Sequence, residues 1–264
     1  EIPDNNLDDD GNGFVDDEYG YDFASGIADP SDSGDHGTHV AGTAAAVGHN
    51  HSGVIGVAYP AKIMALKASN NGTNFTSEAI IQAIQYAAMM KTRGVNVVAI
   101  NASFGGGGFS SLESAAIQTA GTAGIVYCSA AGNDSANIDV NPDYPSSYGL
   151  PNMLVVAASD QNDAIASFSN FGANSVDLSA PGVNILSTSP TNRPGTISSV
   201  LQGATTYAAQ PLGFSGTTTG ITAMIYDCGL GYPTNFPAAV RSNIALIGRG
   251  TLFFTEKVSN AIAA

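Results

Sequence analysis

The chain has 264 residues, 44% of them hydrophobic, which is enough to bury a sizeable core and suits one large domain with part of another. Its net charge of −14, with 8 Lys and Arg residues against 22 Asp and Glu, argues against nucleic acid or an anionic membrane surface as a partner. No apolar run approaches the roughly 20 residues of a membrane-spanning helix, so we expect no membrane segment.

Side-chain oxygens recur at alternate positions in the acidic segment 8–17. Their spacing around a glycine matches the first ligand positions of a calcium loop. The predicted ligands are the side chains of Asp8, Asp10, Asn12 and Asp16 and the backbone carbonyl of Phe14. The twelfth position holds Tyr19 instead of the Glu of an EF-hand, which leaves Asp17, Glu18 or Asp4 to supply a further oxygen. We expect a structural calcium ion here; the alternative is a solvated acidic loop.

The segment 36–46, His-Gly-Thr-His-Val-Ala-Gly-Thr-Ala-Ala-Ala, predicts a helix of small residues that begins at His36 and can lie buried in a domain. A histidine held at a helix start can pass protons between a nucleophile and a carboxylate. A lone histidine is more often structural, so the hypothesis depends on the whole string. His36 and His39 could also bind a metal, but no third ligand accompanies them at a known spacing. Asp35 is interpreted as a loop or cap residue.

Strands and helices alternate after this segment. Apolar residues recur at helical spacing from Thr76 until Gly94, and Ser110 with Glu113 three residues later has the spacing of a capping box. The expected strands are 63–66, 95–101, 125–130 and 154–158. This order predicts an α/β fold, with a parallel sheet flanked by helices and right-handed crossovers. Ligands of such sheets bind beyond the carboxyl ends of the strands, where segments 103–105 and 131–133 fall.

Four segments resemble, in the right order, the motifs of the subtilisin-like serine proteases, or subtilases. They are the histidine string at 36–42, the strand 95–101 leading into Ala-Ser-Phe-Gly-Gly at 102–106, Ala-Gly-Asn at 131–133, and Ser-Ala-Pro-Gly-Val at 179–183. The resemblance implies a serine endopeptidase that hydrolyses peptide bonds in proteins through an Asp-His-Ser triad.

The resemblance also implies roles for individual residues. His36 would be the general base, His39 the second, non-catalytic histidine, and Asn133 the donor to the oxyanion. An extended substrate would bind along Ser103, Phe104 and Gly105, and the wall of the pocket for the residue before the scissile bond would be Ala130, Ala131 and Gly132.

Two of the family's motifs are missing from the chain. No strand ending in Asp-Thr-Gly or Asp-Ser-Gly precedes His36, and the nearest string to the nucleophile's Gly-Thr-Ser is Ser-Gly-Thr at 215–217. We therefore expect an internal fragment of a longer protease that is inactive by itself. A catalytically silent, calcium-binding interaction module of the same fold is the alternative, because it would need neither motif.

The composition changes after Pro181. Residues 186–203 are rich in Ser, Thr, Pro and Gly and read as a linker, and 227–231 with 243–250 resemble the protease-associated domain, a small β-rich module inserted in some subtilases. We expect a partial catalytic domain at 1–195 and a partial protease-associated domain at 196–264. Cys128 is expected as a buried strand thiol, while a bridge to Cys228 is left open. The acidic, Trp-free composition favours a secreted, extracellular protein, and we expect a monomer.

Overall fold

The computed structural model describes residues 2, 5–50, 53–71 and 74–190, and the backbone of four strands further along the chain. The chain divides into two compact units, Glu1–Thr191 and Asn192–Ala264. Within the described residues, no helix combines the length and the hydropathy needed to cross a membrane.

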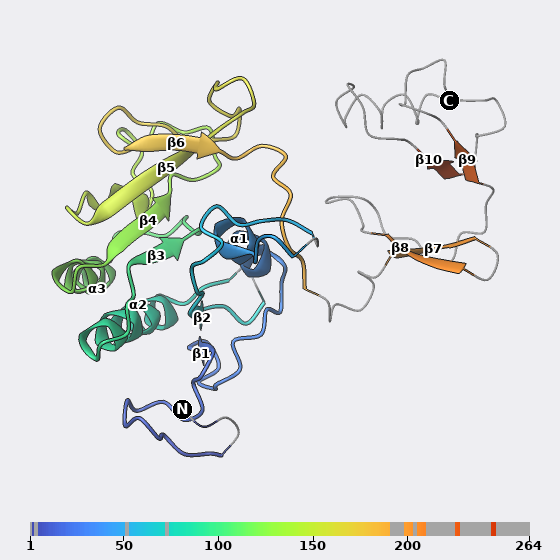
Figure 1. The fold of residues 1–264 in the computed structure, drawn as a ribbon. Helices are drawn as coiled ribbons and strands as arrows, with labels where there is room; N and C mark the ends of the chain where they lie inside the picture. The colour runs from blue at the N-terminus through green and yellow to red at the C-terminus, as the bar shows by residue number, and fades with distance from the viewer. Residues whose placement is uncertain are drawn as a thin grey trace. The chain divides into compact units, whose positions relative to one another are not determined.

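A four-stranded parallel sheet forms the centre of the first unit (Figure 1). Its strands lie side by side in sequence order: β3 (Ala99–Ala102), β4 (Val126–Ala130), β5 (Met153–Ser159) and β6 (Leu178–Pro181). The predicted parallel sheet flanked by helices is confirmed. β6 was not expected as a strand, because segment 178–181 is too short and polar to show an alternating pattern.

The predicted strand at 63–66 belongs to a different sheet. β2 (Ala65–Lys67) pairs in parallel with β1 (Gly20–Asp22), which sequence analysis did not predict, and the two form a separate sheet. A Cβ on Gly20 would lie 1.9 Å from the carbonyl oxygen of Ala65, so this close pairing requires glycine at the start of β1. A strand of three residues is too short for periodicity to reveal.

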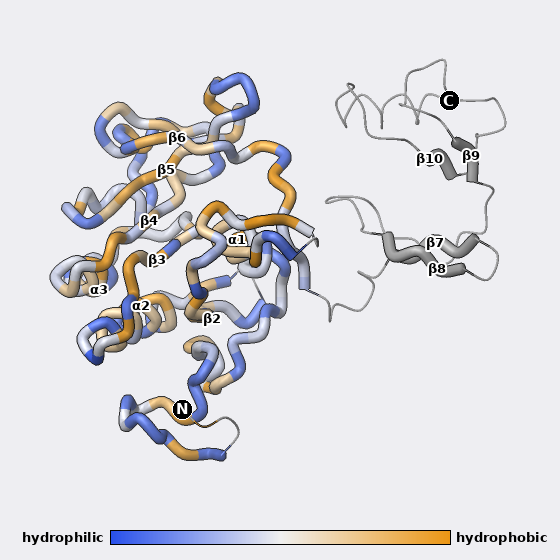
Figure 2. The backbone as a smooth tube through the Cα atoms, viewed as in Figure 1, coloured by the Kyte–Doolittle hydropathy of each residue, from blue (hydrophilic) through white to orange (hydrophobic). Residues whose placement is uncertain are grey.

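Helices α2 (Ser77–Thr92) and α3 (Ser111–Thr122) pack together against the sheet. Each begins as the sequence predicts, because Thr76 Oγ1 accepts the backbone N–H of Ala79 and Ser110 Oγ accepts that of Glu113. Their shared core contains Ile84 and Ala88 of α2, Ala116, Ile117 and Ala120 of α3, Ala102 and Tyr127 of the sheet, and Ile125 just before β4. In Figure 2 orange stretches follow the strands of the sheet and α2, while blue and orange alternate in the loop near the N-terminus.

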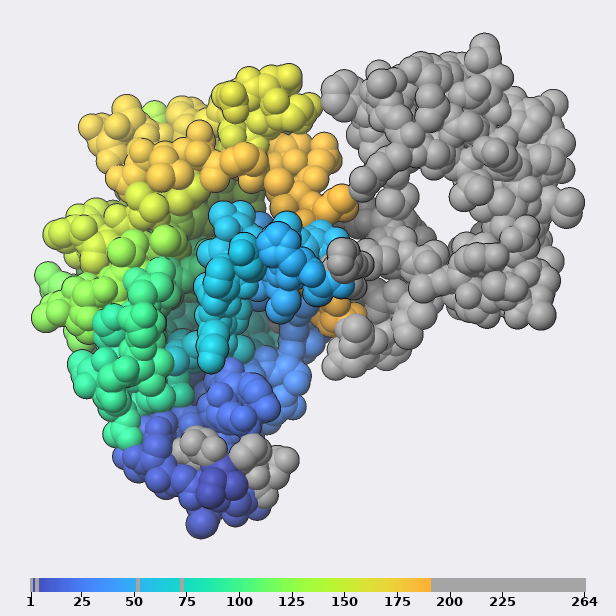
Figure 3. Space-filling model, in the orientation of Figure 1, coloured from blue at the N-terminus to red at the C-terminus, as the bar shows by residue number. Residues whose placement is uncertain are grey.

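Helix α1 (His36–Ala45) forms as predicted, but it is not buried. Gly42 is its one buried residue, and the light blue atoms around α1 lie at the surface in the space-filling view (Figure 3). Helices of small residues gain little from burial, and this one is held through its backbone instead. Its last carbonyls accept the N–H groups of Gly56, Val57 and Ala58.

Four short strands are described in the second unit. β7 (Ser198–Gln202) pairs antiparallel with β8 (Thr205–Ala209), and β9 (Ile225–Asp227) pairs parallel with β10 (Ile244–Leu246). The remaining residues of the expected protease-associated domain, Cys228 among them, lie outside the described residues. The assignment of this unit stays a prediction.

Candidate active site

His36 is the first residue of α1, and its side chain is exposed. Asp35 occupies the N-cap position without a side-chain cap hydrogen bond. The helix start is instead satisfied by Asp32, whose carboxylate accepts the N–H of Thr38 at 2.9 Å and its hydroxyl at 2.7 Å. Asp32 therefore fixes the turn that carries His36, a role that sequence analysis missed because Asp32 lies outside the usual cap position.

Segment 185–188, which follows β6, is hydrogen-bonded to the first turn of α1. His39 Nε2 donates to the carbonyl of Ile185 at 3.1 Å, so this side chain is hydrogen-bonded, as the sequence predicts. Ser187 and Thr188 donate their hydroxyls to the carbonyls of His39 and Thr38 at 2.6 and 2.7 Å. The chain after the Ser-Ala-Pro-Gly motif is thus bonded directly to the histidine helix.

Gly42 allows this contact. A Cβ at this position would lie 2.1 Å from Thr188 Oγ1 and 2.6 Å from Ser187 Oγ. Any larger residue would push segment 185–188 away from the helix. The glycine of the histidine motif therefore has a packing role here.

Asn133 lies in an exposed position just after β4, beyond Ala131 and Gly132. The loop is fixed by the buried side chain of Asn170, whose Oδ1 accepts the N–H groups of Asp134 at 2.8 Å and of Ala136 at 3.0 Å. Its Nδ2 donates to the carbonyl of Ala131 at 3.0 Å. Sequence analysis missed Asn170, since a single asparagine in a loop has no periodic signal.

The two predicted substrate-binding segments follow neighbouring strands. In the parallel register Ala102 of β3 lies opposite Ser129 of β4, so 103–105 and 130–132 leave the sheet at the same edge. Phe104 is half-buried and stacks on Phe75 with ring centroids 5.1 Å apart, while Gly105 is exposed. In Figure 1 the arrowheads of β3 and β6 point to the side of the sheet where α1 lies. Among the described residues, His36 and Asn133 share no hydrogen bond.

Asp22 ends β1 ahead of His36, but its carboxylate has other partners. It is 1% exposed, pairs with Lys67 Nζ at 3.0 Å, and accepts the N–H groups of Ala24 and Ser25. These contacts make Asp22 a structural residue of the β1–β2 sheet.

The acidic segment 8–17 folds into a hydrogen-bonded loop. Asp8 and Asp10 both accept the N–H of Asn12 at 2.9 Å, and the N–H of Gly13 lowers the pKa of Asp8. Asp10 also lies 3.4 Å from Arg93 at the end of α2.

The rest of the predicted ligand set is more dispersed. Asp16 accepts the N–H groups of Asn5 and Asn6, and the buried Asp17 accepts from Asn12 Nδ2 and Tyr86 Oη. Within the described ranges, no group of at least three His, Cys, Asp or Glu side chains is arranged to hold a metal ion. Asp4 lies outside the described residues.

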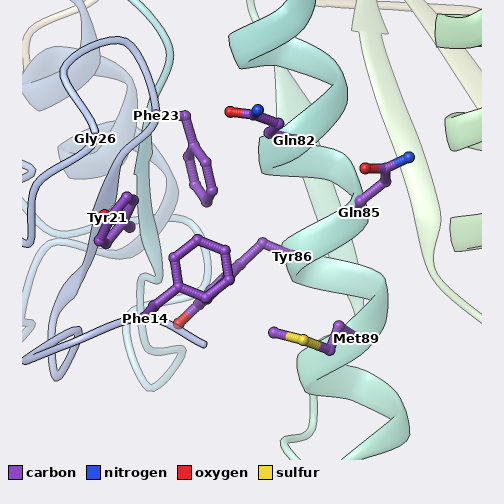
Figure 4. Close-up of a pocket in the computed structure, with 8 residues that line it drawn as sticks. All are labelled: Phe14, Tyr21, Phe23, Gly26, Gln82, Gln85, Tyr86 and Met89. Carbon is purple, nitrogen blue, oxygen red and sulfur yellow. The ribbon is translucent and has the colours of Figure 1, made fainter. Parts of the chain in front are cut away.

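An aromatic pocket of about 440 Å³ lies between the N-terminal segment and α2 (Figure 4). Its lining residues are Phe14, Tyr21, Phe23, Gly26, Gln82, Gln85, Tyr86 and Met89. The rings of Phe14 and Tyr86 meet edge to face with centroids 5.0 Å apart. None of the predicted catalytic or substrate-binding residues lines it, so we interpret it as a packing feature that joins the acidic loop to α2.

Cys128 is half-buried in β4 and free, and burial raises the pKa of its thiol. The expected strand thiol is therefore found, though it is less buried than predicted. A raised pKa disfavours the reactive thiolate, so this cysteine is not a candidate nucleophile.

Known proteins match much of this chain in sequence. The chain is 41% identical over 174 residues to "Thermophilic serine proteinase" of Bacillus sp. (strain AK1), which covers 66% of this chain and 41% of that protein. It is 39% identical over 173 residues to thermitase of Thermoactinomyces vulgaris, covering 66% and 58%. It is also 39% identical over 214 residues to "Extracellular protease" of Xanthomonas campestris pv. campestris, covering 78% and 35%.

Solved structures also match this chain. A cold-adapted subtilisin-like serine proteinase matches with a TM-score of 0.55 at 33% identity, covering 64% of this chain and 57% of that one. Sphericase matches with a TM-score of 0.53 at 34% identity, covering 60% and 56%. The chain spans 41% and 58% of the first two curated relatives. Because the model of the subtilase family matches residues 4–219 of the 264, this chain belongs to the subtilase family.

Proposed function

We propose that the protein containing this chain is a serine endopeptidase in which His36 is the general base. The observation that carries the proposal is the start of α1, where His36 is exposed while the turn behind it is fixed by Asp32 and by segment 185–188. A general base must face substrate and keep one orientation, and the exposure of His36 with the fixed turn behind it supports this role. The relatives' names as serine proteinases support the same reaction.

His36 would take the proton of a serine nucleophile and later give it to the leaving amine. A carboxylate must hold the imidazole in one tautomer during this transfer. Neither the serine nor this carboxylate is assigned to a described residue, and Asp22 and Asp35 are unsuited by their positions. In this proposal both groups come from parts of the protein outside the described ranges.

Asn133 would donate its side-chain amide to the developing oxyanion. Its exposure beyond β4 and the fixed backbone of its loop support this role, because a donor aimed in advance stabilises the transition state without reorganisation. A protein substrate would lie extended along Ser103, Phe104 and Gly105, and the side chain before the scissile bond would lie against Ala130, Ala131 and Gly132.

Calcium would have a structural role in segment 8–17. Asp8 and Asp10 converge on one N–H group, and these hard carboxylate oxygens are ligands that calcium prefers. The side chains of Asn12 and Asp16 and the carbonyl of Phe14 complete the proposed set. The ion would neutralise clustered negative charge in a loop that Arg93 and Tyr86 already join to α2.

The remaining proposals concern the whole protein. We propose a secreted enzyme, supported by the relative named an extracellular protease and by the acidic composition, and we expect it to be a monomer. The second unit would be part of a protease-associated domain, as segments 227–231 and 243–250 suggest.

The oxyanion role is tested by Asn133→Leu in the full-length gene product. In subtilisin, a member of the same family, loss of the equivalent donor lowers kcat about 10²- to 10³-fold, and we expect a similar fall with little change in KM. The Asn133 side chain makes no hydrogen bond to the described residues, so the melting temperature should stay that of the wild type. A variant with unchanged kcat would refute the role, and a wild-type protein that neither cleaves casein nor reacts with a fluorophosphonate would refute the endopeptidase.

A further inference from the structure

Asp143 lies between the two segments that would bind substrate. It belongs to the loop between β4 and β5, just before the short 3-10 helix Ser146–Tyr148. Its backbone is held firmly, since its carbonyl accepts the N–H of Ser147 at 2.8 Å and the hydroxyl of Ser146 at 2.9 Å. The position of its side chain is therefore set by the local fold.

The carboxylate of Asp143 is anchored through one oxygen. Oδ1 accepts the N–H of Gly106 at 2.9 Å, on the segment that follows β3. Oδ2 lies 2.8 Å from the place of a Cβ on Gly105 and 3.3 Å from the place of a Cβ on Gly132. The second oxygen thus occupies the space over these two glycines, between the predicted binding segments, and Asn170 Nδ2 lies 2.2 Å from the same place on Gly132.

No cation of the described residues neutralises this oxygen. The ion pairs found there are Lys67 with Asp22 and Arg93 with Asp10, and Oδ2 of Asp143 receives no hydrogen bond from the described part of the chain. Asp143 is half-buried, and its carboxylate oxygen beside the two glycines is a strong acceptor for a charged donor. A hydrophobic group at the same place would remove water from it without replacing the hydrogen bond.

We propose that Asp143 makes this protein select substrates with lysine or arginine immediately before the scissile bond. The proposal rests on the endopeptidase function and on the pocket wall at 130–132. A basic side chain would enter between segments 103–105 and 130–132, and its ammonium or guanidinium group would donate to Oδ2. Hydrogen bonds between charged groups are the strong ones, so the preference is expressed in kcat/KM.

The test uses the full-length gene product and four succinyl-Ala-Ala-Pro-X-p-nitroanilide peptides, with X as Lys, Arg, Phe or Leu. We expect the wild type to cleave the Lys and Arg peptides faster than the Phe and Leu peptides. In Asp143→Asn, which can still accept the N–H of Gly106, kcat/KM for Lys relative to Phe should fall about 10- to 100-fold. The loss should fall on the Lys peptide, and the Phe peptide should be cleaved at least as well as before.

Asp163→Asn is the matched control. Asp163 is exposed in the loop between β5 and β6 with φ 62°, a backbone conformation that asparagine also adopts. Asp163→Asn removes the same negative charge as Asp143→Asn. If the ratio of kcat/KM for the Lys and Phe peptides changes equally in both variants, a local role of Asp143 is refuted. A wild type that prefers Phe, or an Asp143→Asn ratio equal to that of the wild type, would also overturn the proposal. Failure to cleave any peptide or casein would refute the endopeptidase itself, a different result.

Discussion

Asn170 Nδ2 donates a hydrogen bond to the carbonyl oxygen of Ala131 at 3.0 Å, from the loop between β5 and β6 to the residue that follows β4. Through its other atom, Oδ1, the same side chain accepts two N–H groups of the loop that carries Asn133. The side chain is 1% exposed. One buried amide thus joins the loop between β5 and β6 to the segment that carries Asn133.

Asn170→Ala should lower both the free energy of unfolding and kcat. The change leaves the buried carbonyl of Ala131 and two part-buried N–H groups without their partner, at a cost of roughly 1–3 kcal/mol in the free energy of unfolding. Urea unfolding measures this cost. If Asn170 positions Asn133, kcat at a temperature where the variant is folded falls while KM changes little. A variant with lower stability and wild-type kcat would show that Asn170 is only structural.

Calcium removal should lower the melting temperature of the full-length protein. Binding to the folded form alone, at a free calcium concentration about 100 times Kd, adds about 2.7 kcal/mol. Asp8→Asn should reduce the shift between calcium and chelator, because it weakens a proposed ligand while preserving its shape. Asp29→Asn, a charge-matched change outside the loop, should respond as the wild type does. Equal melting temperatures with and without chelator would contradict the calcium site.

Glu113 should make stability depend on pH. It is 7% exposed, and burial raises the pKa of its carboxyl above the ordinary 4.5, although the hydrogen bond from Tyr148 Oη at 2.7 Å opposes this. Between 4.5 and the raised folded value, the folded state binds more protons than the unfolded state. Stability from this group is therefore present below pH 4.5 and lost as the pH rises through the folded pKa.

Unfolding of Glu113→Gln at pH 4 and pH 7 checks this sign. The amide cannot ionise, so the variant should gain stability relative to wild type as the pH rises from 4 to 7. Glu78→Gln, in the first turn of the neighbouring helix α2, is the control. A difference between variant and wild type that is the same at both pH values would rule out the raised pKa.

Sequence patterns predicted the long elements of the first unit well. The helices starting after Thr76 and Ser110 and the strands around 126–130 and 153–159 each have a clear period or cap. In a capping box the Glu113 side chain would accept the backbone N–H of Ser110. Here Tyr148 Oη lies between them: it accepts the N–H of Ser110 and donates to Glu113. A contact between residues 38 apart has no local signal.

Sequence motifs predicted the two proposed catalytic residues of the site, but not the residues that contact the segments around them. His36 and Asn133 stand in recognisable strings, whereas Asp32, Asn170 and Asp143 act through contacts that only the folded chain brings together. β1 and β6 were missed because strands of three or four residues show no clear alternation. Short polar segments therefore need the tertiary structure to be interpreted.

The most direct test of the central claim is kcat/KM of His36→Ala in the full-length gene product. His36 is exposed at the start of α1, so its removal should leave folding and the calcium-dependent melting temperature unchanged. Loss of the general base should lower turnover of a peptide substrate about 10⁶-fold, the size that this loss has in subtilisin. Wild-type proteolysis by a folded His36→Ala variant would contradict the endopeptidase mechanism.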